Sequence, residues 1–211
     1  MAQKAKPAAK SETGWRGSRE GWLGAAYEVL IREGIDAVKI LPLADRLGLS
    51  RTSFYWFFKD RDALLAALAE MWDARTTAPL TAACAAYAET ETEAMLNVIG
   101  CFLRPETFDA RLEFAMRGWG LQDGAIMAQI GAADQARLAA LVALLERWGH
   151  SAGDADVRAR TIYLVQIGYI ALRSEESLET RLGRIPHYVE IYTGRPPESR
   201  EMARFRARFI P

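Results

Sequence analysis

The side chains best suited to recognition chemistry lie in one run that begins at Arg51. Arg51, Thr52 and Ser53 stand at the start of a predicted helix, which is the part of a helix that meets base edges when it enters the major groove of DNA. The guanidinium of Arg51 can donate two hydrogen bonds to O6 and N7 of a guanine, whereas Thr52 and Ser53 can bond either bases or phosphates. We therefore expect Arg51 to be the base reader.

Aromatic and cationic donors follow this first turn. They are Tyr55, Trp56, Lys59 and Arg61. Hydroxyl, indole and cationic groups suit contacts with the phosphates that fix a protein's register on DNA. Phe54 is expected to turn into the core. For Trp56 and Phe57, groove contact and packing stay equally open, because large aromatic side chains are more often buried than functional.

Short helices must position these side chains. Apolar residues at three-and-four spacing predict a helix over residues 18–33, and a second runs from 40 to 48. A third covers 51–58 after the capping residue Ser50, and a fourth begins near Asp60.

The turn between the second and third helices spans only about three residues and contains Gly48. Two short helices joined in this way are typical of a helix-turn-helix, whose second helix can enter the major groove. The small residue Ala44 allows the two helices to cross closely. A generic helical hairpin is the alternative, and the polar start of the third helix argues against it.

This segment resembles the TetR family of transcriptional regulators. The span LPLADRLGLSRTSFYWFFKDRDALLAAL, residues 41–68, looks like the family's helix-turn-helix, and motif agreement covers residues 19–68. The resemblance implies DNA contacts for Arg51, Thr52, Ser53, Tyr55, Trp56 and Arg61. Lys59 lies beside this set and joins it on its charge.

Two positions depart from the family pattern. Relatives often carry a polar or basic pair where this chain has Ile40 and Leu41, and we expect Lys39, just before them, to contribute the phosphate contact. Phe57 stands where many members have histidine or another polar residue, which changes the bases that can be read. The operator sequence is therefore not inherited from any relative.

Charge is balanced over the chain but not along it. The 211 residues contain 27 basic and 27 acidic side chains, yet the first 61 hold eleven basic against seven acidic. This asymmetry suggests a nucleic-acid-facing end joined to a different body; a solvated basic tail is the alternative. We expect a flexible basic arm (1–17), a DNA-binding domain (18–64) and a ligand-binding and dimerisation domain (65–211).

The composition excludes a wholly disordered, collagen-like or disulfide-stapled chain. The longest apolar run, residues 138–145, has eight residues, whereas roughly 20 are needed to cross a bilayer. The first residues lack the apolar stretch of a secretory signal. We expect a cytoplasmic protein in which Cys84 and Cys101 are reduced and buried.

The rest of the chain shows helical patterns and almost none of the alternation typical of strands. The predicted segments are 71–88 with Pro79 as a kink, 91–104, 106–118, 123–148, 154–173, 178–192 with a break near Pro186, and 198–209. The predicted fold is all-α, a three-helix helix-turn-helix domain followed by a larger helical domain.

Catalytic and metal chemistry find little support. His150 and His187 follow a helix end and a proline, and no Glu-x-x-His, Cys-x-x-Cys or phosphate-binding glycine loop surrounds them. The glycines of RGWGLQDG indicate a turn, because no strand precedes them. A triad assembled in space is neither visible nor excluded. We expect no catalytic residue, no metal, no cofactor and hence no enzyme.

In the TetR family the central region usually encloses a small-molecule cavity, mainly apolar with a few polar groups. We expect the pocket to be formed by Phe102, Phe114, Arg117, Trp119 and Met127. Arg117 is the first candidate for a polar anchor, for example for a carboxylate ligand. The alternatives are core packing for the apolar residues and an ion pair of Arg117 with Glu113, one turn earlier.

The predicted helix over residues 160–172 is apolar around most of its girth, so its own chain or a partner subunit must bury it. In the TetR family the last two major helices pair across a twofold axis into a four-helix bundle. We expect an interface containing Tyr163, Gln166, Ile167 and Ile170. An intrachain core position is the alternative for each of them.

These features predict a homodimeric regulator, most often a repressor in this family, that binds a pseudo-palindromic double-stranded DNA operator and is released by an unknown small-molecule effector. No membrane partner is expected. Twofold symmetry sets the recognition helices about 34–36 Å apart, a spacing that the ligand alters. Two alternatives remain: a helical enzyme with a coincidental helix-turn-helix, and a protein-interaction module whose head has lost its affinity for DNA.

Overall fold

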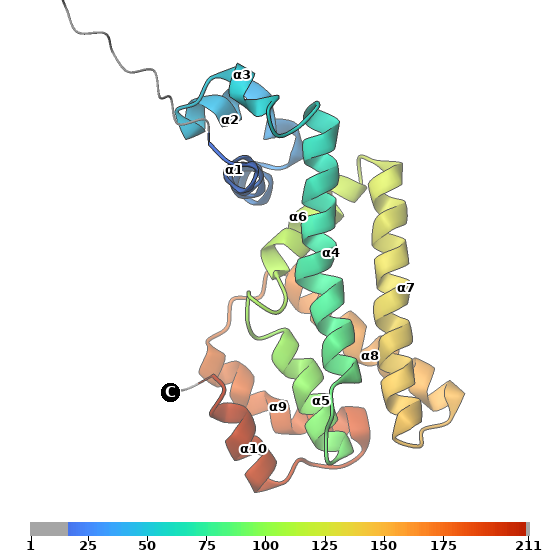
Figure 1. Ribbon diagram of the computed structural model, residues 1–211. Helices are drawn as coiled ribbons and strands as arrows, with labels where there is room; N and C mark the ends of the chain where they lie inside the picture. The colour runs from blue at the N-terminus through green and yellow to red at the C-terminus, as the bar shows by residue number, and fades with distance from the viewer. Residues whose placement is uncertain (1–16, 210–211) are drawn as a thin grey trace, which may run out of the picture.

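The computed structural model describes residues 17–209, and every regular element in this range is helical (Figure 1). The elements are α1 (Arg19–Glu33), the short 3₁₀ helix η1 (Ile35–Ala37), α2 (Ile40–Leu47), α3 (Arg51–Phe54), α4 (Arg61–Ala85), α5 (Glu91–Cys101), α6 (Ala110–Gly120), α7 (Gly124–Arg147), α8 (Ala152–Ala171), α9 (Leu178–Thr193) and α10 (Ser199–Arg206). The predicted all-α fold is confirmed. Residues 1–16 of the predicted arm lie outside the described residues. Between residues 17 and 209, no helix has the length and apolarity that crossing a bilayer requires.

Local capping groups place the first four helices where the sequence predicts them. The side chain of Ser18 accepts a hydrogen bond from the backbone N–H of Gly21, and Ser50 and Asp60 cap α3 and α4 in the same way. Gly48 ends α2 in the left-handed conformation (φ 65°, ψ 30°), which glycine adopts at little cost. The predicted turn from Gly48 to Ser50 is confirmed.

Two predicted boundaries are wrong. The third helix ends at Phe54 instead of residue 58, because the N–H groups of Trp56 and Phe57 bond carbonyls three residues back and wind the chain more tightly than an α-helix. The break expected near Pro186 is absent, since α9 continues through this residue to its end.

Pro79 lies inside α4 without ending it. Proline has no N–H, so the carbonyl of Arg75, four residues earlier, loses its usual helical partner. That carbonyl accepts a hydrogen bond from the backbone N–H of Asp109 instead, at 3.1 Å. The side chain of Asp109 also caps α6 by accepting from the N–H of Leu112. The proline of α4 therefore anchors the start of α6.

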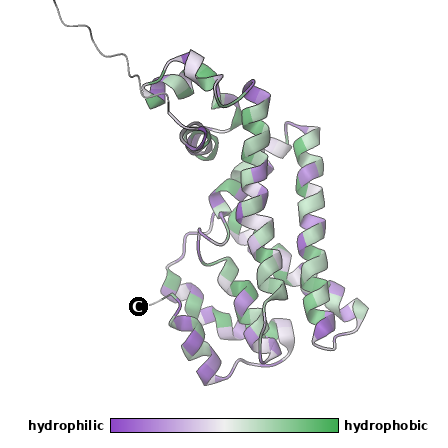
Figure 2. Ribbon diagram, viewed as in Figure 1, coloured by the Kyte–Doolittle hydropathy of each residue, from purple (hydrophilic) through white to green (hydrophobic). Residues whose placement is uncertain are grey.

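Two apolar cores hold the chain together, and the green stripes of Figure 2 mark the faces that form them. The first core unites α1, α2, α3 and the first half of α4 with α6 and the start of α7. The second lies among the rest of α4, α5, α7, α8, α9 and α10. It contains Cys84 and Cys101, both free and buried as predicted. The first core therefore extends from the predicted DNA-binding domain into α6.

A completely buried ion pair joins four helices. Arg137 of α7 and Glu113 of α6 are both 0% exposed, and their charged groups lie 3.0 Å apart. All five guanidinium N–H groups of Arg137 have acceptors. The acceptors are both carboxylate oxygens of Glu113, the hydroxyls of Thr76 and Thr77 on α4, and the hydroxyl of Tyr163 on α8. Such complete pairing offsets the cost of taking the charges out of water.

Replacing Arg137 with methionine removes the fully buried partner of Glu113, whose remaining ion pair is with the partly exposed Arg117. We expect Arg137→Met to lower the free energy of unfolding by about 3–5 kcal/mol, the usual cost of removing one member of a buried pair. Urea denaturation followed by circular dichroism measures this loss. The control is Arg200→Met, which removes an exposed ion pair with Glu198 and should leave the midpoint nearly unchanged. Equal losses in the two variants would contradict the role of the buried pair.

His150 stands between two carboxylates, after the end of α7. Its Nε2 lies 2.5 Å from Glu91 at the start of α5, and its Nδ1 lies 2.7 Å from Asp154 in α8. Burial by itself lowers the pKa of the imidazole, but the hydrogen bonds with Glu91 and Asp154 outweigh burial and raise the pKa above its ordinary value of 6.5. Protonated His150 donates both ring N–H groups and ties α5 to α8.

Part of the stability must therefore depend on pH. Because the pKa of His150 is raised in the folded chain, its contribution is fully present below the ordinary pKa and is lost as the pH rises through the folded value. We expect His150→Gln to cost about 1–2 kcal/mol of unfolding free energy near pH 5.5 and less near pH 9. Denaturation of both proteins at the two pH values gives the comparison, and a cost independent of pH would refute this role.

Candidate nucleic-acid interface and internal pocket

A buried aromatic ring fixes the helix-turn-helix on α1, and together α1, η1, α2 and α3 form the head of the molecule. Phe54 is 0% exposed, and its ring meets that of Trp22 edge-on with centroids 5.2 Å apart. It also stacks on Phe58 at 5.5 Å. Since α3 has only four residues, these tertiary contacts, not helix length, hold it in place.

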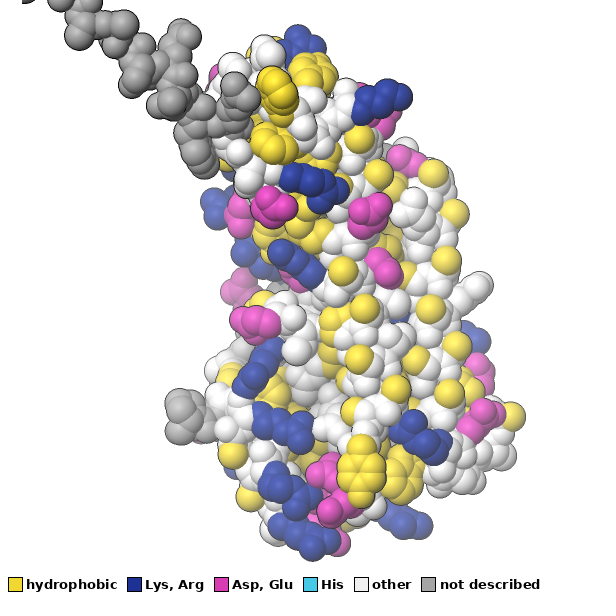
Figure 3. Space-filling view, in the orientation of Figure 1, with side chains coloured by type: hydrophobic (Ala, Val, Ile, Leu, Met, Phe, Trp, Pro, Cys, Tyr) yellow, Lys and Arg dark blue, Asp and Glu magenta, His cyan; other side chains and the backbone are white. Residues whose placement is uncertain are grey.

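Six of the eight predicted DNA-contacting side chains are exposed. They are Lys39, Arg51, Thr52, Tyr55, Trp56 and Lys59. The guanidinium of Arg51 donates a hydrogen bond to the hydroxyl of Tyr55 at 3.1 Å and lies 5.9 Å from the ring centroid. Figure 3 shows hydrophobic and cationic side chains next to one another at this end of the molecule. The structure therefore offers DNA a surface of mixed aromatic and cationic donors.

Ser53 and Arg61, the other two predicted contacts, are engaged inside the head. Ser53 is 6% exposed, and its hydroxyl donates to the carbonyl of Ser50 at 2.6 Å. Arg61 donates to the carbonyls of Val38 at 2.7 Å and Ile35 at 3.1 Å. Both side chains hold the segments that carry the exposed donors, and a DNA contact by either stays a prediction.

The apolar start of α2 is partly exposed to solvent. Leu41 is 56% exposed, whereas Ile40 packs against the first core. The sequence left two aromatic residues open between groove contact and packing. Trp56 is 66% exposed, whereas Phe57 is half-buried against the same core. Lys39, which precedes α2, is exposed as a phosphate contact requires.

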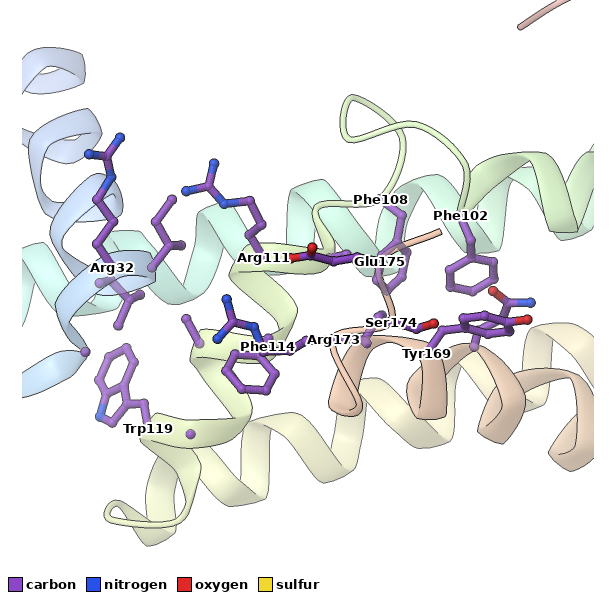
Figure 4. Close-up of a pocket in the computed structure, with 18 of the residues that line it drawn as sticks. Arg32, Phe102, Phe108, Arg111, Phe114, Trp119, Tyr169, Arg173, Ser174 and Glu175 are labelled. Carbon is purple, nitrogen blue, oxygen red and sulfur yellow. The ribbon is translucent and has the colours of Figure 1, made fainter. Parts of the chain in front are cut away.

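A pocket of about 860 Å³ lies between the head and the body (Figure 4). Residues of α1 and η1 line one side, and residues of α6, α8 and the loop after α8 line the other. In Figure 4, Arg32 and Trp119 stand toward one end and Phe102 and Tyr169 toward the other. Because head and body both form walls, an occupant that fills the pocket touches both.

Three of the five predicted pocket residues line this cavity. They are Phe102, Phe114 and Trp119. Arg117 and Met127 do not line it. Arg117 pairs with Glu113 at 2.7 Å, the alternative that the sequence left open, and also with Asp134 at 2.6 Å. It therefore belongs to the buried ion-pair cluster and is not the polar anchor of the pocket.

The polar lining of the pocket comes from residues for which no such role is predicted from the sequence. They are Arg32, Arg111, Gln122, Gln166, Tyr169, Arg173, Ser174, Glu175 and Arg181. Four positions of the lining, 166, 169, 170 and 173, follow helical spacing and so share one side of α8. This spacing indicates from the sequence that the four residues share one side of α8, but it does not show which other helices that side faces.

The predicted interface residues of α8 face their own chain. Tyr163 is 2% exposed and donates to Asp134 at 2.6 Å, and Gln166 is 6% exposed beside the pocket. Ile167 and Ile170 are partly buried against the second core. These are the intrachain positions that the sequence left as the alternative.

A different set of apolar residues on α8 is exposed. Val157 and Leu164 are 63% and 61% exposed, and Leu172, directly after the helix, is 82% exposed. Their spacing of seven and eight residues places them on one side of α8. On α9, Ile191 is 63% exposed. The first three form a stripe along α8, with polar residues such as Arg160 between them.

The head also matches a known family by sequence. Residues 23–68 match the model of the bacterial regulatory proteins of the tetR family. This span contains the turn at Gly48 and all six exposed donors. Residues 23–68 therefore form a helix-turn-helix segment of the tetR type.

Tetracycline repressors share this TetR-family segment. The class D protein of Escherichia coli and the class H protein of Photobacterium damsela subsp. piscicida are each 43% identical over 52 residues. The match covers 25% of this chain and 24% of each repressor. The chain thus matches only about a quarter of the length of these curated relatives, and the likeness does not extend to their bodies.

Two solved structures share the TetR fold along nearly the whole chain. A transcriptional regulator from Rhodococcus sp. Rha1 has a TM-score of 0.57 at 17% identity, covering 92% of this chain and 100% of that one. A protein described as a TetR-family transcriptional regulator from Mesorhizobium loti MAFF303099 has a TM-score of 0.55 at 12% identity, covering 94% and 98%. These likenesses show the fold: a TetR helix-turn-helix domain followed by a helical body, as predicted.

Proposed function

We propose that this chain is a TetR-family transcriptional regulator of the cytoplasm that binds a double-stranded DNA operator as a homodimer and releases it when a small molecule fills the pocket. One observation carries the proposal: the helix-turn-helix within residues 23–68 exposes six donors beside a buried, rigid support. The relatives that share this segment are named repressors, so repression is the direction we propose.

Arg51 is the side chain we assign to base reading. Its planar guanidinium can form two hydrogen bonds to one guanine, and its bond to the Tyr55 hydroxyl restricts its motion before DNA arrives. Thr52, next to it, can reach a base or a phosphate. Lys59 and Lys39 flank the motif and fit phosphate contacts.

The exposed stripe on α8 is the surface we assign to the homodimer. Arg158 of α8 donates to the carbonyl of Tyr192 of α9 at 2.9 Å, so the helix ends that carry Val157 and Ile191 lie together. Two copies packing these faces across a twofold axis make a four-helix bundle and bury the stripe. The same symmetry makes the operator pseudo-palindromic, with recognition helices about 34–36 Å apart.

The pocket between head and body is the element we assign to control. An occupant that binds better when the head is displaced changes the spacing of the two heads, and linkage requires DNA to weaken that occupant by the same factor. The proposed division of labour is a DNA-binding domain (18–64) and a ligand-binding and dimerisation domain (65–211). α4 runs through both, as Figure 1 shows.

Selection of double-stranded DNA from a random pool by the purified chain tests the proposal. At near-physiological salt, where bare phosphate attraction is weak, we expect enrichment of a pseudo-palindrome. On the selected site, Arg51→Ala should cost about 1–3 kcal/mol and relax the preference at one position of each half-site. Lys59→Ala should weaken binding to all sequences alike and reduce the salt slope by about one. No enrichment by a folded dimer, or an unchanged preference in Arg51→Ala, would contradict the proposal.

The dimer surface has a separate test. Leu164→Glu puts a charge in the exposed stripe of α8, so we expect this variant to sediment at the single-chain mass of 23.5 kDa, while the wild type sediments at twice that mass. Leu121→Glu, at an 81% exposed leucine after α6 that lies outside the stripe, is the matched control and should remain dimeric. A Leu164→Glu chain that stays dimeric would exclude the stripe as the interface.

A further inference from the structure

The pocket has an apolar wall made largely of aromatic rings. Phe102 and Phe108 touch with ring centroids 4.6 Å apart, and Phe114, Trp119 and Ile170 extend this lining. Phe114 is 43% exposed and presents apolar surface to the pocket. A flat or alkyl group entering the pocket would bury these rings, and burial of apolar area favours binding.

The charged residues around this wall are mostly cationic. The pocket is lined by four arginines, Arg32, Arg111, Arg173 and Arg181, and by one acidic residue, Glu175. Arg32 is engaged by Glu28 at 3.1 Å. The other three arginines form no ion pair with any residue from 17 to 209, although Arg173 lies over the Phe114 ring at 5.6 Å. The pocket therefore carries an excess of positive charge that its own chain does not neutralise.

Arg181 is the most deeply placed of these cations. It is half-buried, with its guanidinium 5.6 Å from the centroid of the Tyr169 ring. Burial lowers the pKa of Arg181, and the nearby charge of Glu176 offsets this effect only in part. Glu176 forms its salt bridge with Arg184 instead. A half-buried guanidinium without a salt-bridge partner is costly for the folded chain, and a bound anion would offset that cost.

Gln166 supplies an independent indication of a ligand. It is 6% exposed and lines the pocket, yet its side-chain amide makes no hydrogen bond to any described residue. The amide therefore opens onto the pocket, where a ligand can bond it. Gln166, Tyr169 and Arg181 also border a second, small cavity of about 20 Å³ beside α9, so these three side chains lie at one place. An amide donor and a guanidinium at one place match the oxygens of a carboxylate.

The geometry points to an amphipathic carboxylate as the occupant of this pocket, with its charged end at Arg181 and Gln166 and its apolar body among Phe102, Phe108 and Phe114. The inference rests on the proposed function, since it names the chemical class of the effector. A carboxylate fits better than a polyanion, because one half-buried arginine and one amide lie together here, whereas the other three arginines of the lining are exposed to solvent. The lining has a polar part at Arg181 and Gln166 and an aromatic part at the three phenylalanines, so it suits a ligand with a charged end and an apolar body.

Isothermal titration of the full-length chain with matched probes tests this assignment. The probes are octanoate against octan-1-ol and 4-phenylbutanoate against 4-phenylbutan-1-ol, with octylamine as the cationic comparison and acetate as the acid without an apolar body. We expect each of the two longer acids to bind at least about tenfold more tightly than its alcohol, as a charge-assisted pair allows. Octylamine and acetate should bind weakest.

Two variants locate the charged end. Arg181→Gln removes the cation and should reduce the preference for acid over alcohol to about twofold or less, and Gln166→Leu should reduce it several-fold. Arg195→Gln removes an equal charge from an exposed position outside the pocket and should keep the full preference. Thermal unfolding of all three variants verifies that each is folded.

Equal affinities for acid and alcohol, tighter binding of the amine, or no binding of either longer acid would overturn the inference. So would an acid preference that survives Arg181→Gln and Gln166→Leu. The outcomes separate this inference from the proposed regulation. If an alcohol releases the selected operator as effectively as the matching acid does, the proposed regulation stands and the carboxylate assignment is wrong. If an acid binds at Arg181 but does not change the affinity for the operator, the carboxylate assignment stands and the proposed regulation is wrong.

Discussion

The fold depends on two opposite charges that water does not reach. Removing Arg137 and Glu113 from water costs several kcal/mol per ion unless each donor and acceptor is matched. Here the match is complete for Arg137, and Glu113 also accepts from the indole N–H of Trp72 at 2.6 Å and from Arg117 at 2.8 Å. The partners come from α4, α6, α7 and α8. A shift of any one of these helices would take a hydrogen-bond partner away from a buried charged group, so the cluster sets their relative positions.

α4 and α6 connect this cluster to the DNA-reading end. Trp72 of α4 bonds the cluster, and Leu64 and Leu68 of the same helix are buried in the core of the head. In α6, Glu113 belongs to the cluster, Met116 belongs to the core of the head, and other residues line the pocket. A displacement of α6 by an occupant therefore acts on the head and on the buried pair together. This is the physical route for the control that we propose.

The head could be predicted closely because its determinants are local. Ser50 and Gly48 each fix a helix end through contacts within a few residues, so the turn and the exposed donors follow from the sequence. The body could not be predicted in this way, since periodicity shows which side of a helix is apolar but not what covers it. The apolar pattern therefore predicts a partner subunit over Tyr163 and Gln166, whereas the structure buries both in their own chain. Arg117 bonds Asp134 on another helix, a contact that no local pattern encodes.

Coupling between the head and the pocket is tested most directly by the affinity of one carboxylic acid for the dimer with and without operator DNA. The carboxylic acid that binds best would be titrated into the free dimer and into the dimer saturated with its selected operator. Reciprocity predicts that the operator weakens the acid by the same factor by which the acid weakens the operator, typically about 5–150-fold. Identical affinities for the acid in the two titrations would show that the pocket and the head do not communicate.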